Sequence, residues 1–106
     1  MDKIMVSVIM PVYNSEEYLE TAIKSVLNQK MEEMRAMKDS VLEIESIMVG
    51  RSLGWVGAAN TVTMVIDLKD RNAFDTLMAS PAHIEVGNKA AEAFETDNFV
   101  ISQIEY

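Results

Sequence analysis

The sequence predicts an α+β fold in which an antiparallel sheet carries helices on one face. Residues 4–12 form an apolar run with the length and composition of a buried strand. The stretch that follows repeats apolar residues at spacings of three and four, as in an amphipathic helix. Residues 61–68 alternate apolar and polar side chains, which is typical of a strand with one buried face. The length of 106 residues and the hydrophobic content of 49% fit a single domain, residues 1–106.

The first strand and the first helix follow each other closely. Both alternating sets of residues 4–10 are largely apolar, so both faces of this strand are expected to be buried. Pro11 lacks a backbone donor and should end the pairing. Asn14, with Glu17 three residues later, resembles a capping box, and we expect the helix from Ser15 to about Asp39.

The predicted helix carries a long apolar stripe, and five charged residues lie mostly on its other side: Glu20, Lys24, Glu32, Lys38 and Asp39. Its methionines are interpreted as core side chains, because methionine fills irregular gaps between packed elements. At ~1.5 Å per residue the helix would measure roughly 37 Å, so a kink or break is expected near Gln29 and Lys30. The stripe comprises Leu19, Ala22, Ile23, Val26, Leu27, Met31, Met34, Met37 and Val41.

The rest of the chain predicts two more strands, a pair of helical segments and a final strand. Residues 42–49 form the second strand and lead into a loop with three glycines around Trp55. In the third strand, residues 61–68, Val62, Met64 and Ile66 face the core. A helix follows over residues 70–79, Pro81 opens a further helical turn, and residues 99–106 are the last strand. The order β-α-β-β-α-β is that of the ferredoxin-like fold.

Composition excludes several classes of function. A formal charge of −8 repels nucleic acid and anionic membranes, so neither is an expected partner. The chain has no cysteine and one histidine, and its carboxylates show no ligand spacing, so no metal and no cofactor are expected. The apolar run at residues 4–12 is too short for a membrane span. A cytoplasmic location is expected.

Residues 6–29, VSVIMPVYNSEEYLETAIKSVLNQ, closely resemble the N-terminus of family 2 glycosyltransferases, where the P-V-Y-N-like turn lies near the base of a sugar nucleotide. That family continues with an acidic segment and an Asp-x-Asp-like motif that holds a metal on the diphosphate, and this sequence has no Asp-x-Asp. The resemblance therefore implies a shared strand and helix without sugar transfer. A natural coincidence, a recombined gene and a designed chimera would all produce this pattern.

Residues 42–106 resemble the Dabb family, the stress-responsive dimeric α/β-barrel domains. The resemblance is carried by EIESIMVG, by TVTMVIDLKDRNAFDTLMASPAHIEVGNKAAEAF and by FVISQIEY. It implies a ferredoxin-like subunit whose sheet pairs with that of a second copy to close a dimeric α/β barrel. The expected partners are therefore a second copy of the chain and a small apolar ligand.

The Dabb resemblance also indicates a candidate site around His83, in SPAHIEVG. A plant polyketide cyclase of that family uses a histidine there as a general base, with a tyrosine six residues earlier, where this chain has Leu77. His83 is thus the candidate catalytic residue, although packing at a helix entrance is the preferred interpretation. The candidate ligand-binding residues are Tyr13, Trp55, Leu77 and His83.

Three functions stay open at this point. The first is a homodimeric ferredoxin-like protein of the Dabb type that binds a small apolar ligand and is not an enzyme. The second is a polyketide-cyclase-like enzyme or lyase that uses His83. The third is a glycosyltransferase-derived fragment or chimera without activity.

Overall fold

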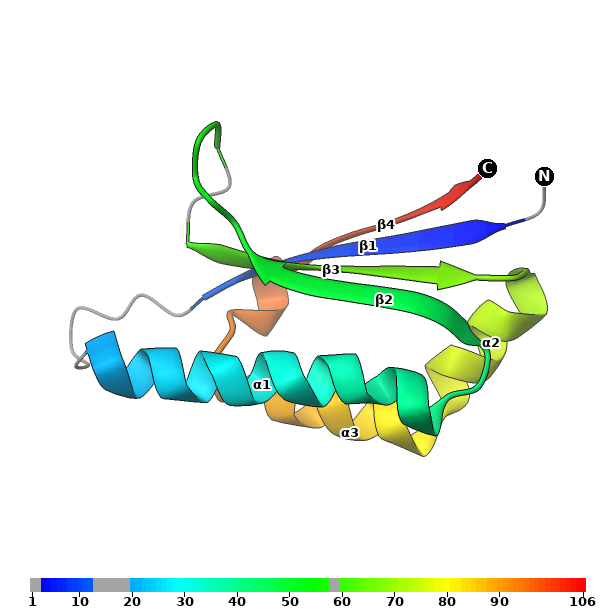
Figure 1. The fold of residues 1–106 in the computed structure, drawn as a ribbon, viewed down its shortest axis with the longest axis horizontal. Helices are drawn as coiled ribbons and strands as arrows, with labels where there is room; N and C mark the ends of the chain where they lie inside the picture. The colour runs from blue at the N-terminus through cyan, green and yellow to red at the C-terminus, as the bar shows by residue number, and fades with distance from the viewer. Residues whose placement is uncertain (1–2, 13–19, 58–59) are drawn as a thin grey trace.

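The chain folds into a four-stranded antiparallel sheet with its helices packed on one face (Figure 1). The computed structural model describes residues 3–12, 20–57 and 60–106. The elements in chain order are β1 (Ile4–Pro11), α1 (Glu20–Ser40), β2 (Ile44–Arg51), β3 (Thr61–Leu68), α2 (Arg71–Ala79), α3 (Pro81–Ala90), a 3-10 turn η1 (Thr96–Asn98) and β4 (Val100–Glu105). The strand order is β2-β3-β1-β4, and every neighbouring pair is antiparallel. The predicted ferredoxin-like α+β fold is confirmed.

Local sequence signals explain where the elements begin and end. Pro11 is the last residue of β1, as expected for a residue without a backbone donor. Asp70 caps α2, because its Oδ1 accepts a hydrogen bond of 2.9 Å from the backbone N–H of Ala73. Ser80 separates α2 from α3 and caps the latter, and Pro81 occupies the first turn of α3, where its missing N–H costs nothing.

The first helix differs from its prediction at one point. α1 is continuous from Glu20 to Ser40, so the break expected near Gln29 and Lys30 is absent. The expected start at Asn14 and Ser15 lies outside the described residues. Lys30 sits on the inner side of α1 at 3% exposure, and its ammonium forms ion pairs with Glu33 and Glu92. Because these carboxylates compensate the buried charge, Lys30 can occupy an inner position of the continuous helix.

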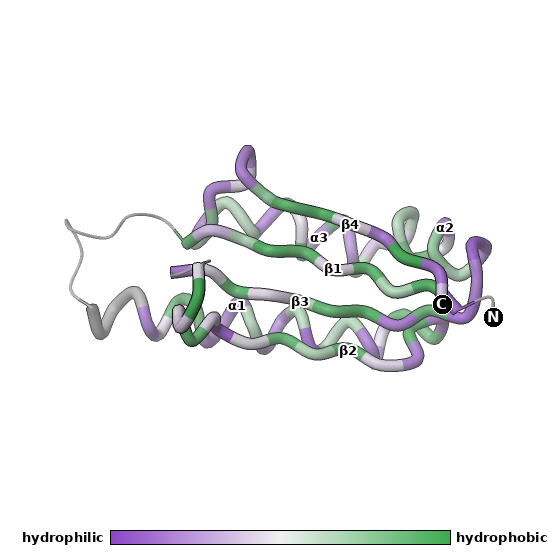
Figure 2. The backbone as a smooth tube through the Cα atoms, turned by 90° about the horizontal axis from the view of Figure 1, so that it is seen from above, coloured by the Kyte–Doolittle hydropathy of each residue, from purple (hydrophilic) through white to green (hydrophobic). Residues whose placement is uncertain are grey.

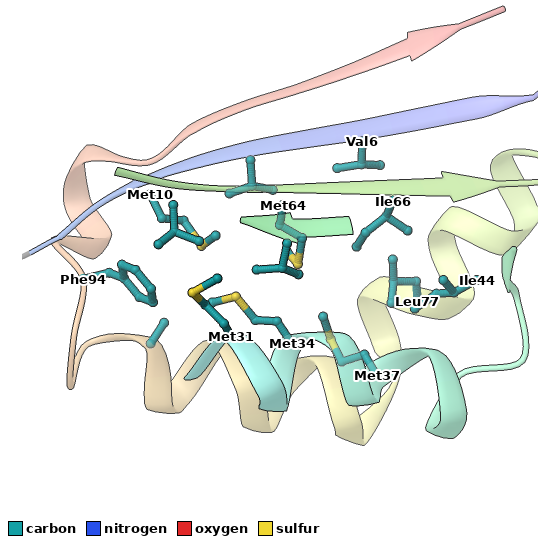
Figure 3. Packing of buried hydrophobic residues seen from close by; sticks show 14 of the residues in the cluster. Val6, Met10, Met31, Met34, Met37, Ile44, Met64, Ile66, Leu77 and Phe94 are labelled. Atoms are coloured by element: carbon teal, nitrogen blue, oxygen red, sulfur yellow. The ribbon is translucent and has the colours of Figure 1, made fainter. Parts of the chain in front are cut away.

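The hydrophobic core fills the space between the sheet and the helices (Figure 3). Alternate residues of β1 and β3 point into it, and the predicted inner set Val62, Met64 and Ile66 is at most 7% exposed. Met31, Met34 and Met37 of α1 meet these strands, so the core role predicted for the methionines is confirmed. Phe94, which follows α3, is completely buried and closes one end of the core.

None of the helices that the structure describes lies over the other face of the sheet (Figures 1 and 2). Figure 2 looks onto this face, with β4, β1, β3 and β2 side by side and the helices behind them. The alternate residues of β1 are only half-buried here, so the expectation of two buried faces is met on one face alone. None of the helices in the described part of the chain is long and apolar enough to cross a membrane.

Candidate functional site: the open face of the sheet

The sheet face away from the helices presents apolar side chains to solvent. The strand register places Ile104 beside Met5 and Val100 beside Ile9, while Met48 lies beside Val65 on the neighbouring strands. Three of these side chains, Met48, Val100 and Ile104, are 68%, 60% and 52% exposed. We call this surface the open face; its apolar residues are Met5, Ile9, Met48, Val65, Val100 and Ile104.

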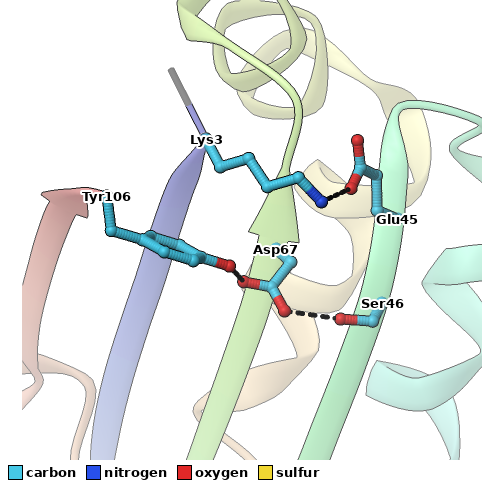
Figure 4. A network of polar contacts seen from close by, with 5 residues as sticks. All are labelled: Lys3, Glu45, Ser46, Asp67 and Tyr106. Atoms are coloured by element: carbon cyan, nitrogen blue, oxygen red, sulfur yellow. Dashed lines mark hydrogen bonds and ion pairs between the residues drawn. The ribbon is translucent and has the colours of Figure 1, made fainter. Parts of the chain in front are cut away.

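A polar network joins the strands at one end of the open face (Figure 4). The hydroxyl of Tyr106 donates a hydrogen bond of 2.7 Å to Oδ1 of Asp67, and that of Ser46 donates one of 2.7 Å to Oδ2. The Lys3 ammonium lies 2.9 Å from Oε2 of Glu45. These contacts link residues on or next to all four strands, so they fasten the end of the sheet.

The network also fixes the ionisation of Asp67. The hydrogen bond from Tyr106, and then that from Ser46, hold the pKa of the Asp67 carboxyl below its usual value. The same bond raises the pKa of the Tyr106 hydroxyl, because it stabilises the protonated phenol. Each oxygen of Asp67 already accepts a hydrogen bond. A carboxylate held in this way is a poor proton acceptor. The geometry therefore favours a structural role for Asp67, joining the strands, over the role of a general base.

His83 lies in the first turn of α3, on the helix side of the sheet. Its backbone N–H donates a hydrogen bond of 3.1 Å to Oγ of Ser80, as at a capped helix start. Its side chain is half-buried, and Nδ1 is enclosed without a hydrogen-bond partner among the residues that the structure describes. An enclosed polar atom without a partner is uncommon and marks a place where a ligand or water would gain a hydrogen bond.

The other predicted ligand-binding residues are not gathered around His83. Leu77, on α2, has no exposed surface and belongs to the core. Trp55 lies in the loop between β2 and β3 and is 84% exposed. That loop rises on the open side of the sheet, whereas α2 and α3 cover the other side (Figure 1). Tyr13 lies outside the described residues.

Two further features bear on ligands. A surface groove of about 200 Å³ lies between α1 and α3, with Met37, Val86 and Lys89 among its lining residues. It is smaller than the usual 300–1,000 Å³ of a small-molecule site. Across residues 3–12, 20–57 and 60–106, no three histidine or acidic side chains are grouped as a metal site requires.

Sequence reasoning missed part of this arrangement. The Asp67–Tyr106 pair joins residues 39 positions apart, and only the strand order brings them together. The exposure of Leu53 and Val56 beside Trp55 was also missed. The signal in the sequence was a set of large apolar residues in a stretch with the two turn-forming residues Gly54 and Gly57.

The sequence comparison matches part of the chain to one family. Residues 7–47, which include most of β1, all of α1 and the start of β2, match glycosyl transferase family 2. The match spans less than half of the chain. No match to the sequence was found among curated proteins.

Solved structures share the whole fold at low sequence identity. A dimeric protein of unknown function with a ferredoxin-like fold from Bacteroides fragilis superimposes with a TM-score of 0.80 at 16% identity, covering 98% of this chain and 96% of the other. A dimeric ferredoxin-like protein of unknown function from Thermobifida fusca gives 0.72 at 14% identity, covering 100% and 93%. SnoaB, a cofactor-independent oxygenase from Streptomyces nogalater, gives 0.67 at 10% identity, covering 100% and 94%. The chain is therefore a ferredoxin-like α+β protein.

Proposed function

We propose that this chain is a homodimeric protein of the Dabb type, in which the open faces of two copies close an α/β barrel. The observation that carries the proposal is the open face itself, an uncovered sheet surface with six apolar side chains. In a lone subunit these side chains would stay in water. Burying apolar surface is worth roughly 25 cal/mol per Å², and a two-fold axis covers the same patch on both copies at once.

The architecture supports this arrangement. Two four-stranded sheets that pack face to face lie about 10 Å apart, so side chains from both can interdigitate between them. Eight strands are enough to enclose a barrel that side chains fill. The relatives from Bacteroides fragilis and Thermobifida fusca are described as dimeric, which supports self-association for a chain of the same fold.

The test compares two isoleucines of β4. Ile104 lies beside Met5 on the open face and is 52% exposed, whereas Ile101 lies beside Val8 on the other face and is 55% exposed. Ile104→Glu should raise the dimer dissociation constant by at least about tenfold, because it places a carboxylate in the apolar contact on both copies. Ile101→Glu should leave it nearly unchanged. Sedimentation equilibrium measures both, and equal effects of the two variants would count against the proposed interface.

The proposed ligand is a small apolar molecule held between the sheet and the helices near His83. The enclosed Nδ1 of His83 offers it one polar contact, and the methionine-rich core offers side chains that adapt to different shapes. No cofactor, nucleic acid or membrane belongs to this proposal, and we assign the protein to the cytoplasm. Naphthalene should raise the melting temperature of the parent chain; no shift at saturating naphthalene would argue against an apolar site.

A second candidate function is catalysis by His83 in the manner of a polyketide cyclase or lyase. The unpartnered Nδ1 favours it, because a general base must have a free nitrogen for its substrate. Leu77 weakens it, since a buried leucine cannot hydrogen-bond a substrate oxygen. We expect His83→Ala to cost on the order of 1 kcal/mol of stability, with no polyketide cyclisation by either protein. Cyclisation by the parent, lost in His83→Ala and at an unchanged melting temperature, would reverse this choice.

A third candidate is a glycosyltransferase-derived segment without activity, favoured by the family match over residues 7–47. The matched residues include most of β1 and all of α1 of this fold. The sequence lacks the Asp-x-Asp motif that would hold the metal ion of a glycosyltransferase. Calorimetric titration with uridine diphosphate sugars and manganese should give no heat. Micromolar binding would restore a link with sugar nucleotides.

A further inference from the structure

The loop between β2 and β3 presents an apolar tip that is largely exposed. Leu53, Trp55 and Val56 are 73%, 84% and 95% exposed. Figure 1 shows that this loop rises from the sheet on its open side, away from the helices. We call residues 52–57 the arm.

The backbone, and not packing, sets the direction of the arm. Its base is fastened by the N–H of Ser52, which donates a hydrogen bond of 2.9 Å to the carbonyl of Thr61. The N–H of Gly54 donates one of 3.1 Å to Oγ of Ser52. Gly54 and Gly57 have φ angles of 68° and 61°, in the left-handed region that glycine adopts at little cost. These features turn the chain at the tip without covering its apolar side chains.

We propose that the arm grips a second copy of this chain beside the open face, which is an inference that rests on the proposed homodimer. Because the arm rises on the same side as the open face, a copy packed on that face comes within its reach. The arm and the open face then lie on the same side of the subunit (Figure 1), and the same copy covers both.

The area of the open face supports this occupant. Three strands of eight residues and one of six, about 4.8 Å apart and with about 3.3 Å per residue, give a flat footprint of roughly 500 Å². A stable interface buries about 800 Å² on each partner. A tryptophan side chain can bury about 150–250 Å², so Trp55 with its two apolar neighbours supplies roughly the missing area.

The charge of the arm also suits a second copy. Residues 50–61 contain one basic residue, Arg51, and no acidic residue, whereas the whole chain has a net charge of −8. The arm can therefore approach an acidic copy of the chain without the repulsion that acts between the rest of the two surfaces.

The single tryptophan of the chain makes the arm directly observable. In the parent protein, the Trp55 emission should be blue-shifted at concentrations where light scattering gives a dimer. It should move to the wavelength of a tryptophan in water as dilution yields the monomer. A dimer whose Trp55 emits as in water would contradict the proposed contact of the arm but would remain consistent with the proposed homodimer. A monomer at all concentrations would overturn both, and a blue shift that needs phosphatidylcholine vesicles would assign the arm to a membrane instead.

A matched pair of leucines separates the arm from general surface effects. Leu53→Ser removes an apolar side chain of the arm, whereas Leu42→Ser removes one that is 90% exposed in the turn between α1 and β2. We expect Leu53→Ser to raise the dimer dissociation constant by about three- to tenfold, and Leu42→Ser to leave it unchanged. Equal dissociation constants for the two variants would contradict the proposed contribution of the arm to the dimer interface. Far-ultraviolet circular dichroism checks that both remain folded.

Discussion

The two faces of one sheet are built from alternate residues of the same strands, but they end in different environments. On β1, Val6, Val8 and Met10 lie against the helices and are at most 8% exposed. Met5 and Ile9, on the same strand, are only half-buried on the open face. Along β1 and β3 the covered face is buried within one subunit, whereas the apolar open face still has surface to bury. Substitutions on the covered face should therefore change the free energy of unfolding, and substitutions on the open face should change the dimer dissociation constant.

The largest effect should come from the covered face at Phe94. Its ring is completely buried and lies edge-on to Phe99, with the ring centres 6.4 Å apart. Phe94→Ala should lower the free energy of unfolding by about 3–5 kcal/mol, because it leaves a cavity that the core cannot fully close. Urea denaturation measures this, and Leu42→Ala, at an exposed position, is the control. A loss below about 1 kcal/mol would mean that this end of the core is not packed as described.

The second prediction uses one residue type on both faces. Met64 of β3 is 7% exposed on the covered face, and Met48 of β2 is 68% exposed on the open face. Met64→Ala should cost about 2–5 kcal/mol of unfolding free energy. Met48→Ala should cost the subunit less than about 0.5 kcal/mol and should weaken the dimer instead. Denaturation of diluted monomer, combined with sedimentation of the dimer, separates the two costs; similar folding costs would remove the distinction between the faces.

The third prediction concerns the buried charge of Lys30. Its ammonium lies 3.6 Å from Oε2 of Glu33 and also pairs with Glu92, whose pKa it lowers through a hydrogen bond. Lys30→Met should change stability by no more than about 1 kcal/mol, because Glu92 is exposed and returns to water. Glu92→Gln should be the more damaging change, since it leaves a buried ammonium with a weaker partner. In thermal denaturation, Glu92→Gln should lower the melting temperature more than Lys30→Met does. A larger loss for Lys30→Met would contradict the predicted role of this ion pair.

The smallest effect should be a pH dependence at the polar end of the open face. The pKa of Asp67 is lowered from 3.8 by the Tyr106 hydroxyl, so the folded state binds this proton less readily than the unfolded state. The resulting stability is fully present above about pH 4 and is lost as the pH falls through the lowered pKa. The effect should be small, because solvent screens this exposed pair.

The variant that tests this is Tyr106→Phe, which removes the hydroxyl and keeps the ring. The difference in unfolding free energy between parent and variant should be constant near neutral pH and should shrink as the pH falls below about 4. Tyr106→Phe in a background of Asp67→Asn is the control and should show no such change. A difference that stays constant to pH 2 would rule out the proposed cause.

The sequence predicts the covered face better than the open face, for a physical reason. Alternation in residues 61–68 and the three- and four-residue spacing from Leu27 to Val41 record burial within one chain, and both are confirmed, whereas Val26 of the predicted stripe is 36% exposed. The open face shows as apolar residues such as Val65, but its pairings depend on strand order, which residue spacing does not encode. The buried position of Lys30 on α1 is compensated by Glu92, 62 positions later, so local rules could not indicate it.

The candidate site was less predictable than the fold. The sequence singled out Trp55, Leu77 and His83 together, but they lie in a loop, in the core and at a helix start. Residue type and resemblance selected each of them, whereas the direction of each side chain depends on packing between elements. The chemical role of His83 stays a prediction, because its enclosed Nδ1 is compatible with a ligand and with a tightly packed helix entrance.

The most direct test of the account is the mass of the parent chain in solution, because the central claim is that a second copy covers the open face. One chain has a mass of 11.9 kDa. Multi-angle light scattering at micromolar concentration should return about twice that mass, as expected for a closed two-fold pair. A mass of one chain throughout the accessible concentration range would contradict the account, because the open face would then be the surface of a stable monomer.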